Sequence, residues 1–355
     1  MSSYPVAASP VASSRAPSLR LTGASVDIRS SAVNVIKWMG VDQEIFRGML
    51  AKIFIDPVME RVKLIFDESV DNIEQRDDGV VVRFANSKEV KTYDLLVAAD
   101  GLGSRIRGIM LNSKPREQIY GEDVHVAYFT INSDLLQGCR LAKWYNATGG
   151  RCIFLRPDPA GRTRGDLINV TARGDIETKK RLNEALREGN ESYMKLMEEI
   201  FCDAGWVAPE VLQSMHESVD FYCSLFTQVR SPKIHDGRVV LLGDAGYATP
   251  GFGTSLAIIG GYVLAGELYS HPDDIKTALK QYEELMLPFA KDSQGGLPNA
   301  PQLLNPQTQW GIRLRNTILR LVACTKLDKL SMALAVVLGI TEKKLLMPDY
   351  KWPAK

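Results

Sequence analysis

The chain has 355 residues, of which 45% are hydrophobic and 24% charged, as expected for a soluble globular protein of one large domain or two intertwined domains. Its 43 basic and 42 acidic residues leave a net charge of +1, which excludes an electrostatic case for nucleic-acid binding. The four histidines and five cysteines show no metal-ligand spacing, so we expect no metal site and a reducing compartment, the cytoplasm.

The N-terminal part predicts little regular structure. Residues 1–20 are rich in Ser, Ala and Pro without hydrophobic periodicity, so we expect a disordered or extended N-terminus there. A loop and a helix capped by Ser30 or Ser31 should follow. Gly48–Phe54 predicts a short helix that Asp56-Pro57 ends.

Apolar runs then predict a group of strands. Val62–Phe66 and Val70–Ile73 indicate strand, and turns separate them from a second strand over Val80–Phe84 and a third over Tyr93–Ala99. We expect a three-stranded meander that leads back into the parallel sheet. A helix from Gly103 to Met110 follows. The carboxylate of Asp100 and the free N–H groups of the loop should therefore face one ligand region.

The middle of the chain predicts an antiparallel sheet that would form one wall of a substrate pocket. Its strands are Val124–Ile131, Ala142–Ala147, Cys152–Leu155 and Leu167–Ala172, and Phe221–Val229 is a later strand. Helices are expected over Glu177–Glu188 and Ser192–Ala204. Trp144, Tyr145 and Phe154 are candidates for lining the pocket, with the sheet core as the alternative.

A second ligand region is predicted in residues 236–269. The buried strand Val239–Leu242 leads into Gly243-Asp244, a Pro/Gly loop and a helix rich in small residues. Such an arrangement can hold a phosphate or a polyol, because a helix start offers free N–H groups. The alternative is an ordinary strand–loop–helix whose glycines serve tight turns.

The C-terminal part, residues 294–355, predicts helices and a tail. An amphipathic helix from Ile275 is expected to end at Pro288. Helices over Leu314–Ala323 and Leu327–Leu338 should follow. The apolar stretch Leu330–Ile340 is too short to span a membrane, but it could lie on a membrane surface. Packing across the cofactor domain is the favoured alternative.

Two of these stretches resemble a known family. GRVVLLGDAGYATPGFGTS from Gly237 and YDLLVAADGLGSRIR from Tyr93 are similar to two flavin motifs of FAD-dependent aromatic-ring hydroxylases, the para-hydroxybenzoate hydroxylase-like flavoprotein monooxygenases. The resemblance implies that Asp244 contacts the ribityl chain of FAD. It places Gly253, Thr254 and Ser255 near the pyrophosphate and the flavin ring, and Asp100 and Gly101 near the pyrophosphate and NAD(P)H.

Further similarities are shorter. Asp27 and Arg29 resemble a loop near the flavin, although they could be only a surface pair. Arg47-Gly-x-Leu50 resembles a motif whose arginine lies along FAD. The resemblance implies no catalytic side chain, because the flavin carries the chemistry.

The chain also departs from the family pattern. The first strand, the GxGxxG turn and its helix are not found, and Ser14 stands where the family has Glu before an Arg. A segment between about residues 41 and 44 is also shorter than in the family. The expected fold is α/β, with an incomplete Rossmann-like FAD-binding domain with a parallel sheet (21–120 and 220–293), intertwined with an antiparallel-sheet substrate domain (121–219).

Two functions follow from these observations. The first is an FAD-dependent monooxygenase that uses NAD(P)H and O₂ to insert one oxygen atom into a small cyclic or aromatic substrate, in secondary metabolism. The alternative is a flavin-poor remnant that acts as a non-oxidative binding or cyclising protein, or an inactive truncated form. The motifs around Asp100 and Asp244 favour the first, and the missing GxGxxG unit favours the second. The substrate and the oligomeric state are not predicted.

Overall fold

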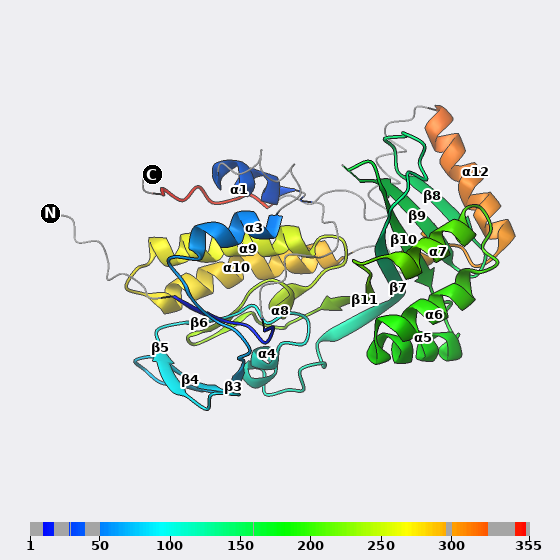
Figure 1. The fold of residues 1–355 in the computed structure, drawn as a ribbon. Helices are drawn as coiled ribbons and strands as arrows, with labels where there is room; N and C mark the ends of the chain where they lie inside the picture. The colour runs from blue at the N-terminus through cyan, green and yellow to red at the C-terminus, as the bar shows by residue number, and fades with distance from the viewer. Residues whose placement is uncertain are drawn as a thin grey trace.

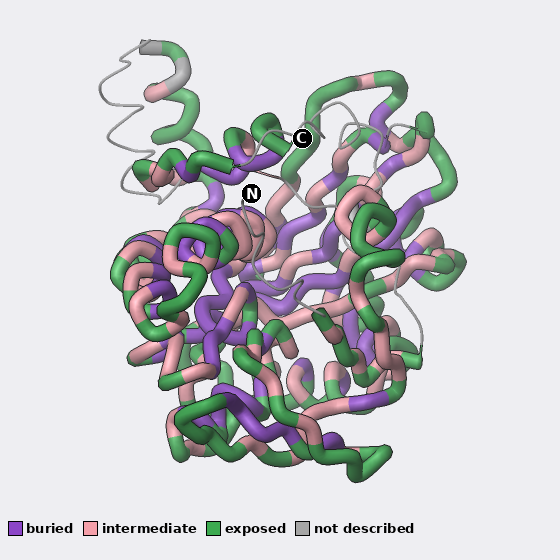
Figure 2. The backbone as a smooth tube through the Cα atoms, turned by 90° about the vertical axis from the view of Figure 1, so that its left-hand side faces the viewer, coloured by how far each residue is buried: buried purple, intermediate pink, exposed green. Residues whose placement is uncertain are grey.

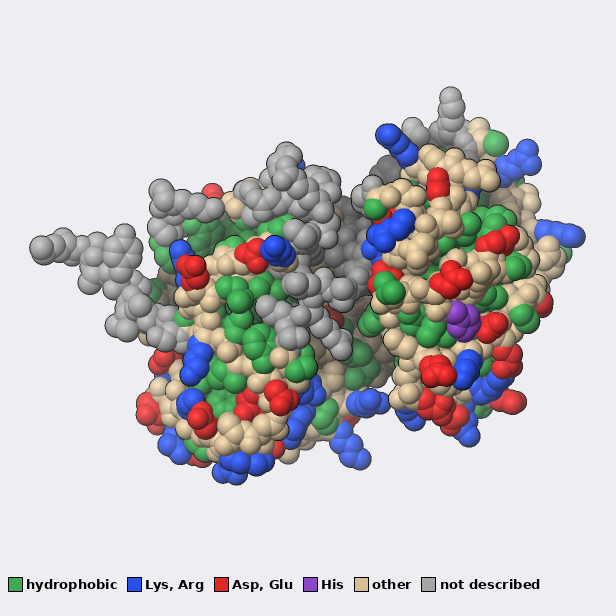
Figure 3. Space-filling model, in the orientation of Figure 1, with side chains coloured by type: hydrophobic (Ala, Val, Ile, Leu, Met, Phe, Trp, Pro, Cys, Tyr) green, Lys and Arg blue, Asp and Glu red, His purple; other side chains and the backbone are tan. Residues whose placement is uncertain are grey.

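The computed structural model describes residues 10–17, 28, 30–39, 50–158, 160–295, 300–325 and 345–352. They form two lobes separated by a hollow in the molecular surface (Figure 1; Figure 3). Parallel and antiparallel sheets occur together with C-terminal helices, which confirms the expected mixed α/β class. Buried residues run through the interior, whereas exposed residues gather on the outer helices and loops (Figure 2).

The first lobe is built from two separate parts of the chain. Its first part contains β1 (Val11–Ser13), α1 (Ser31–Met39), α3 (Leu50–Ile55), the 3-10 turn η1 (Asp56–Val58), β2 (Lys63–Ile65), β3 (Val70–Gln75), β4 (Val80–Phe84), β5 (Val90–Tyr93), β6 (Leu96–Ala98) and α4 (Arg105–Met110). Its second part contains β12 (His235–Asp236), β13 (Val239–Leu241), α8 (Asp244–Tyr247), α9 (Gly253–Ser270) and α10 (Ile275–Gln294).

The second lobe lies between these two parts in the sequence. It contains β7 (Ile119–Ile131), β8 (Lys143–Ala147), β9 (Arg151–Pro157), β10 (Thr163–Val170), α5 (Ile176–Glu188), α6 (Asn190–Phe201), α7 (Ala208–Glu217) and β11 (Tyr222–Val229). The short α11 (Ala300–Leu304) and the longer α12 (Gln309–Thr325) come after the first lobe, and α12 lies beside β8 (Figure 1).

Parallel pairing in the first lobe occurs in two places. β13 runs parallel to β6, and the Leu242 N–H donates to the Ala98 carbonyl at 2.9 Å. β1, within the stretch expected to be disordered or extended, is a strand that runs parallel to β2. The Arg15 guanidinium after β1 lies 3.5 Å from the Asp100 carbonyl oxygen after β6, so the carboxyl ends of the two pairs are neighbours.

The order of the described strands shows which part of the Rossmann-like sheet is not found among them. Doubly wound sheets have the strand order 3-2-1-4-5, so the pair β2–β1 corresponds to strands 3 and 2, and the pair β6–β13 to strands 4 and 5. The place of the first strand would be between β1 and β6. Within the described ranges, no strand occupies that place.

One expected strand is in fact two. β5 pairs with β4 in the meander β3-β4-β5, whereas β6 pairs with β13 in the other sheet, so the prediction of one strand over Tyr93–Ala99 was wrong. The chain changes partner at Asp94-Leu95, after which the Leu96 N–H donates to the Arg238 carbonyl. The sequence of this run does not reveal such an exchange, because segments far away in the chain decide which strand each half pairs with.

The second lobe is an antiparallel sheet of order β11-β7-β10-β9-β8, with α5, α6 and α7 packed on one face. Four of its strands, β7, β8, β9 and β10, were expected from the sequence. β11 also pairs with β7 in this sheet. The return to the first lobe therefore follows residue 229, later than the boundary at residue 220 expected from the sequence.

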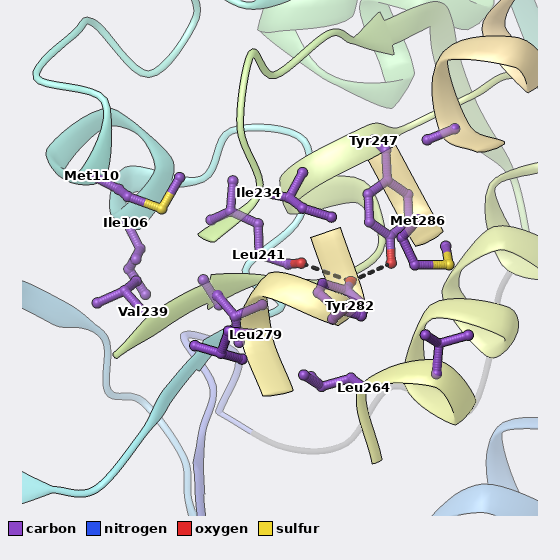
Figure 4. Packing of buried hydrophobic residues seen from close by; sticks show 14 of the residues in the cluster. Ile106, Met110, Ile234, Val239, Leu241, Tyr247, Leu264, Leu279, Tyr282 and Met286 are labelled. Atoms are coloured by element: carbon purple, nitrogen blue, oxygen red, sulfur yellow. Dashed lines mark hydrogen bonds between the residues drawn. The ribbon is translucent and has the colours of Figure 1, made fainter. Parts of the chain in front are cut away.

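The core of the first lobe is organised around α9 and α10 (Figure 4). A Cβ atom at Gly260 would lie 2.0 Å from the Tyr247 hydroxyl, so only glycine lets α9 approach α8 this closely. The Tyr247 and Tyr282 hydroxyls are 3.0 Å apart, and the Tyr282 hydroxyl donates to the Leu241 carbonyl at 3.0 Å. This chain of hydrogen bonds ties α8, α10 and β13 together.

α10 continues past Pro288, contrary to the expectation that it ends there. The proline leaves one carbonyl of the preceding turn without its helical N–H partner. The last turn is nevertheless held, because Phe289 and Ala290 are buried and the Gln294 amide donates to the Val229 carbonyl at 2.6 Å. This amide contact also joins the first lobe to the end of β11.

The C-terminal tail returns to the first lobe, where the Tyr350 hydroxyl donates to Glu267 of α9 at 2.6 Å. The expected helix over residues 327–338 lies outside the described residues. Among the described helices, none is long and apolar enough to cross a membrane.

Candidate cofactor site

The two predicted carboxylates lie at one edge of the parallel sheet. Asp100 follows β6 by two residues, and Asp244 follows β13 by three. The register pairs Leu241 with Ala98, so both strands end at the same level. Ligands of open α/β sheets bind outside the carboxyl ends of the strands, and the two motifs lie together at such an edge.

Asp244 presents an accessible carboxylate. Gly243 turns the chain with φ 62°, a left-handed conformation that favours glycine, and Asp244 is exposed at the start of α8. No described residue donates a hydrogen bond to its carboxylate. Nearby protein displaces bulk water and raises its pKa. A Cβ atom at Gly253 would lie 3.2 Å from Asp244 Oδ1, so a glycine there leaves room for the carboxylate.

Asp100 is only half satisfied. The Arg105 N–H donates to its Oδ2 atom at 3.0 Å, whereas Oδ1 is buried without a partner among the described residues. Gly101 follows with φ 80°, and no atom lies within 4 Å of the place where its Cβ would be. Buried polar atoms normally have a partner, so the orphaned oxygen marks a place where a ligand donor fits.

Arg107 joins the loops that carry the two carboxylates. Its buried guanidinium donates to the carbonyls of Leu102 at 2.8 Å, Pro115 at 2.5 Å and Ala245 at 2.7 Å. Burial lowers the pKa of Arg107, and the charge of Asp100 opposes that shift. In the sequence, Arg107 was recognised only as the last residue of the motif that begins at Tyr93. Its bridging role depends on Ala245, 138 residues away, for which no local signal exists.

The other predicted site residues are placed unevenly. Gly253 and Thr254 are partly exposed at the start of α9, whereas Ser255 is fully buried, which argues against direct contact between Ser255 and a ligand. Asp27, Arg29 and Arg47 lie outside the described residues.

The edge can be tested for its fit to FAD. An accessible carboxylate, an orphaned buried oxygen and glycines that leave open space match the needs of a cofactor carrying a polyol chain and phosphates. The usual pyrophosphate turn follows the first strand of a doubly wound sheet, and that strand's place is the gap between β1 and β6. The described residues therefore fit the ribityl side of the cofactor. They contain no cluster of metal-ligating side chains.

The second lobe turns one sheet face toward the first lobe (Figure 1). Trp144 and Phe154 lie on this face with ring centroids 5.5 Å apart. Tyr145 instead points to the helix-covered face, where its hydroxyl donates to the Ala204 carbonyl at 2.9 Å. The structure thus separates the three candidate lining residues, and Tyr145 is core.

Comparisons with known proteins agree with this geometry. The chain is 31% identical to Monooxygenase CTB7 of Cercospora beticola over 320 residues, which cover 86% of this chain and 74% of that protein. It is 27% identical to the FAD-dependent monooxygenase asL4 of Sarocladium schorii over 402 aligned positions, which cover 95% of this chain and 91% of that protein. That alignment is longer than the chain, so this relative carries internal segments that the chain lacks. No family model matches.

Solved structures share the fold. The tetracycline destructase Tet(51) superposes with a TM-score of 0.68 at 27% identity, covering 97% of this chain and 92% of that one. HpxO of Klebsiella pneumoniae, complexed with FAD and uric acid, has a TM-score of 0.52 at 21% identity, covering 80% and 72% of the two chains. The sequence and structural similarity together confirm the resemblance. The chain belongs to the FAD-dependent monooxygenases, oxidoreductases that insert one oxygen atom of O₂ into a small-molecule substrate.

Proposed function

We propose that FAD binds across the carboxyl edge of β6 and β13, and that the enzyme uses it with NAD(P)H to oxygenate a small cyclic or aromatic compound of secondary metabolism in the cytoplasm. The observation that carries this proposal is the accessible Asp244 carboxylate, which meets Gly253 at the edge shared by two parallel strands. FAD, when bound, supplies the electron-transfer and oxygen chemistry.

The described residues would bind and orient the cofactor. Asp244 would accept hydrogen bonds from the ribityl hydroxyls, and Gly253 with Thr254 would lie beside the flavin. Asp100 Oδ1 would accept a donor from the cofactor or from NAD(P)H, and Arg107 would hold both loops in register. Contacts of Asp27, Arg29 and Arg47 with the flavin stay predictions.

The substrate class is supported by the relatives. The relatives from Cercospora beticola and Sarocladium schorii are monooxygenases, one solved neighbour is a tetracycline destructase, and another holds uric acid. Ring-containing molecules are common to the last two. The sheet face opposite α5, α6 and α7, which carries Trp144 and Phe154, would receive such a ring.

A flavin titration tests the proposal. We expect the purified protein to quench the fluorescence of added FAD and to keep the flavin after desalting. Asp244→Ala should bind FAD at least tenfold more weakly, because a lost hydrogen bond to a charged group costs about 1.5–3 kcal/mol and 1.4 kcal/mol is tenfold. Asp273→Ala, at the far end of α9, is the matched control. Equal affinities of the two variants would contradict the placement of Asp244.

One observation favours the alternative, a flavin-poor remnant. The strand place between β1 and β6, where the phosphate turn would begin, holds no described strand. If the wild-type protein leaves FAD fluorescence unchanged, this alternative replaces the proposal. The two functions are thus distinguished by one titration.

A further inference from the structure

A single row of side chains crosses the face of the five-stranded sheet that α5, α6 and α7 leave uncovered. Asn305 and Arg315 contact the same face at Asn146, beside the Trp144 end of the row. The strand register places one residue of each strand in this row, in the order Tyr222, Tyr128, Asp166, Phe154 and Trp144. We name these five residues the aromatic row. α5, α6 and α7 cover the opposite face, so the row is turned toward the first lobe (Figure 1).

The row is aromatic on both sides of one carboxylate. Tyr128 and Tyr222 stack with centroids 6.0 Å apart, and Phe154 and Trp144 form the second pair. Neighbouring strands are about 4.8 Å apart, so five strands span about 19 Å. Trp144 and Tyr222, at the two ends, are 47% and 48% exposed. A planar molecule of more than one ring can therefore lie across the row.

Asp166 at the centre of the row is buried and poorly satisfied. It is 5% exposed, and its one ion-pair contact among the described residues is with Arg156 at 3.5 Å. Burial raises the pKa of Asp166 to about 6, against the opposing charge of Arg156. The Asp166 carboxylate is therefore mostly ionised at neutral pH, although few of the described residues donate hydrogen bonds to it.

Asp220 is a second carboxylate beside the same sheet, and it has a structural role with which Asp166 can be compared. Asp220 accepts hydrogen bonds from the Thr130 N–H at 2.8 Å and the Thr130 hydroxyl at 2.6 Å, and it pairs with Arg164 at 2.7 Å. Burial alone would raise the pKa of Asp220, but these partners hold it at about 2. Asp220 therefore accepts several hydrogen bonds from its neighbours, whereas Asp166 has the Arg156 contact alone among the described residues.

We propose that the aromatic row is the substrate-recognition surface and that Asp166 selects planar aromatic substrates bearing a hydroxyl donor. The rings would stack on or edge against the aromatic side chains, and the hydroxyl would donate to the Asp166 carboxylate. Arg156 is the positioning residue that holds the carboxylate in the row. This inference rests on the proposed function and specifies the substrate of that site.

The test uses two naphthalene probes, 2-naphthol with a hydroxyl donor and 2-methoxynaphthalene, in which a methyl group replaces the hydroxyl hydrogen. Equilibrium dialysis against the full chain, with and without FAD, measures their affinities. We expect the wild-type protein to prefer 2-naphthol by tenfold or more, and Asp166→Leu and Asp166→Asn to reduce that preference. Phe154→Leu should weaken both probes by similar factors, which shows that stacking and donor selection are separate.

Two results would overturn the inference: absence of 2-naphthol binding to the wild-type protein, or an unchanged preference in both Asp166 variants. Circular dichroism of each variant shows whether it is folded, and the asparagine variant keeps the side-chain shape if the leucine variant fails to fold. The FAD titration is independent of these probes. Bound FAD without donor preference would therefore refute only this inference, whereas donor preference without FAD binding would refute only the proposed cofactor role.

Discussion

Arg107 offers the sharpest test of how the site is held together. Arg107→Ala removes a buried guanidinium that donates to three backbone carbonyls, one in the Asp100 loop, one after α4 and one in α8. Each hydrogen bond from a charged donor contributes about 1.5–3 kcal/mol. Their sum is an upper limit, since contributions of one side chain are not additive and the buried charge itself is costly. We expect a loss of about 3–5 kcal/mol in the free energy of unfolding.

The matched control lies two residues away in the same helix. Arg105 pairs with Asp71 at 3.2 Å, but its side chain is 47% exposed, so Arg105→Ala should cost about 0–1 kcal/mol. Arg107→Lys should be intermediate, because a lysine lacks the planar fork that reaches several carbonyls. Urea unfolding followed by circular dichroism measures all three variants. If Arg107→Ala is no less stable than Arg105→Ala, the bridge does not hold the two loops.

Three further changes test separate parts of the structure. Gly253→Ala puts a Cβ atom 3.2 Å from Asp244 Oδ1 and should weaken FAD binding in a fluorescence titration, whereas Gly261→Ala, with no atom within 4 Å, should not; equal effects would contradict the role of Gly253. Tyr282→Phe removes the donor to a strand carbonyl and should lower the unfolding free energy by about 1–3 kcal/mol, and an unchanged urea midpoint would refute this hydrogen-bond chain. Burial raises the pKa of Asp166 in the folded protein to about 6, above the 3.8 of an ordinary aspartate. Its ionisation therefore destabilises the folded state above pH 6, and that cost disappears as pH falls from 6 to 3.8. Asp166→Asn should therefore gain up to about 3 kcal/mol at pH 7.5 and little at pH 4, as measured by urea unfolding at both pH values; a gain independent of pH would contradict the assignment.

The sequence predicted those strands and helices whose formation depends on residues close to one another along the chain. The strand before Asp244 and the small-residue helix after it follow from composition and spacing, and α9 begins at Gly253 as the Pro/Gly loop indicated. The exchange of partners at Asp94 was not predictable, because strand pairing is decided by distant segments. The helix past Pro288 was missed for a similar reason, since contacts of its last turn with β11 outweigh the local effect of proline.

Side-chain roles divide in the same way. Alternation within β8 allowed Trp144 and Tyr145 to face opposite sides, but the sequence did not tell which side the helices cover. Asp166 carries no motif, and its position among aromatic rings arises only when five strands come into register. Site residues that belong to a local motif could be identified from the sequence. Residues such as Asp166, whose neighbours lie on other strands, could be identified only from the structure.

The gap between β1 and β6 has a consequence for how the protein behaves in solution. Within the described residues, each of these strands hydrogen-bonds to a neighbouring strand along one side alone. Val97 of β6 is 38% exposed, although strands of parallel sheets are normally covered on both faces. Backbone amides along these two edges should therefore exchange with deuterium faster than those of β10, which is paired on both sides.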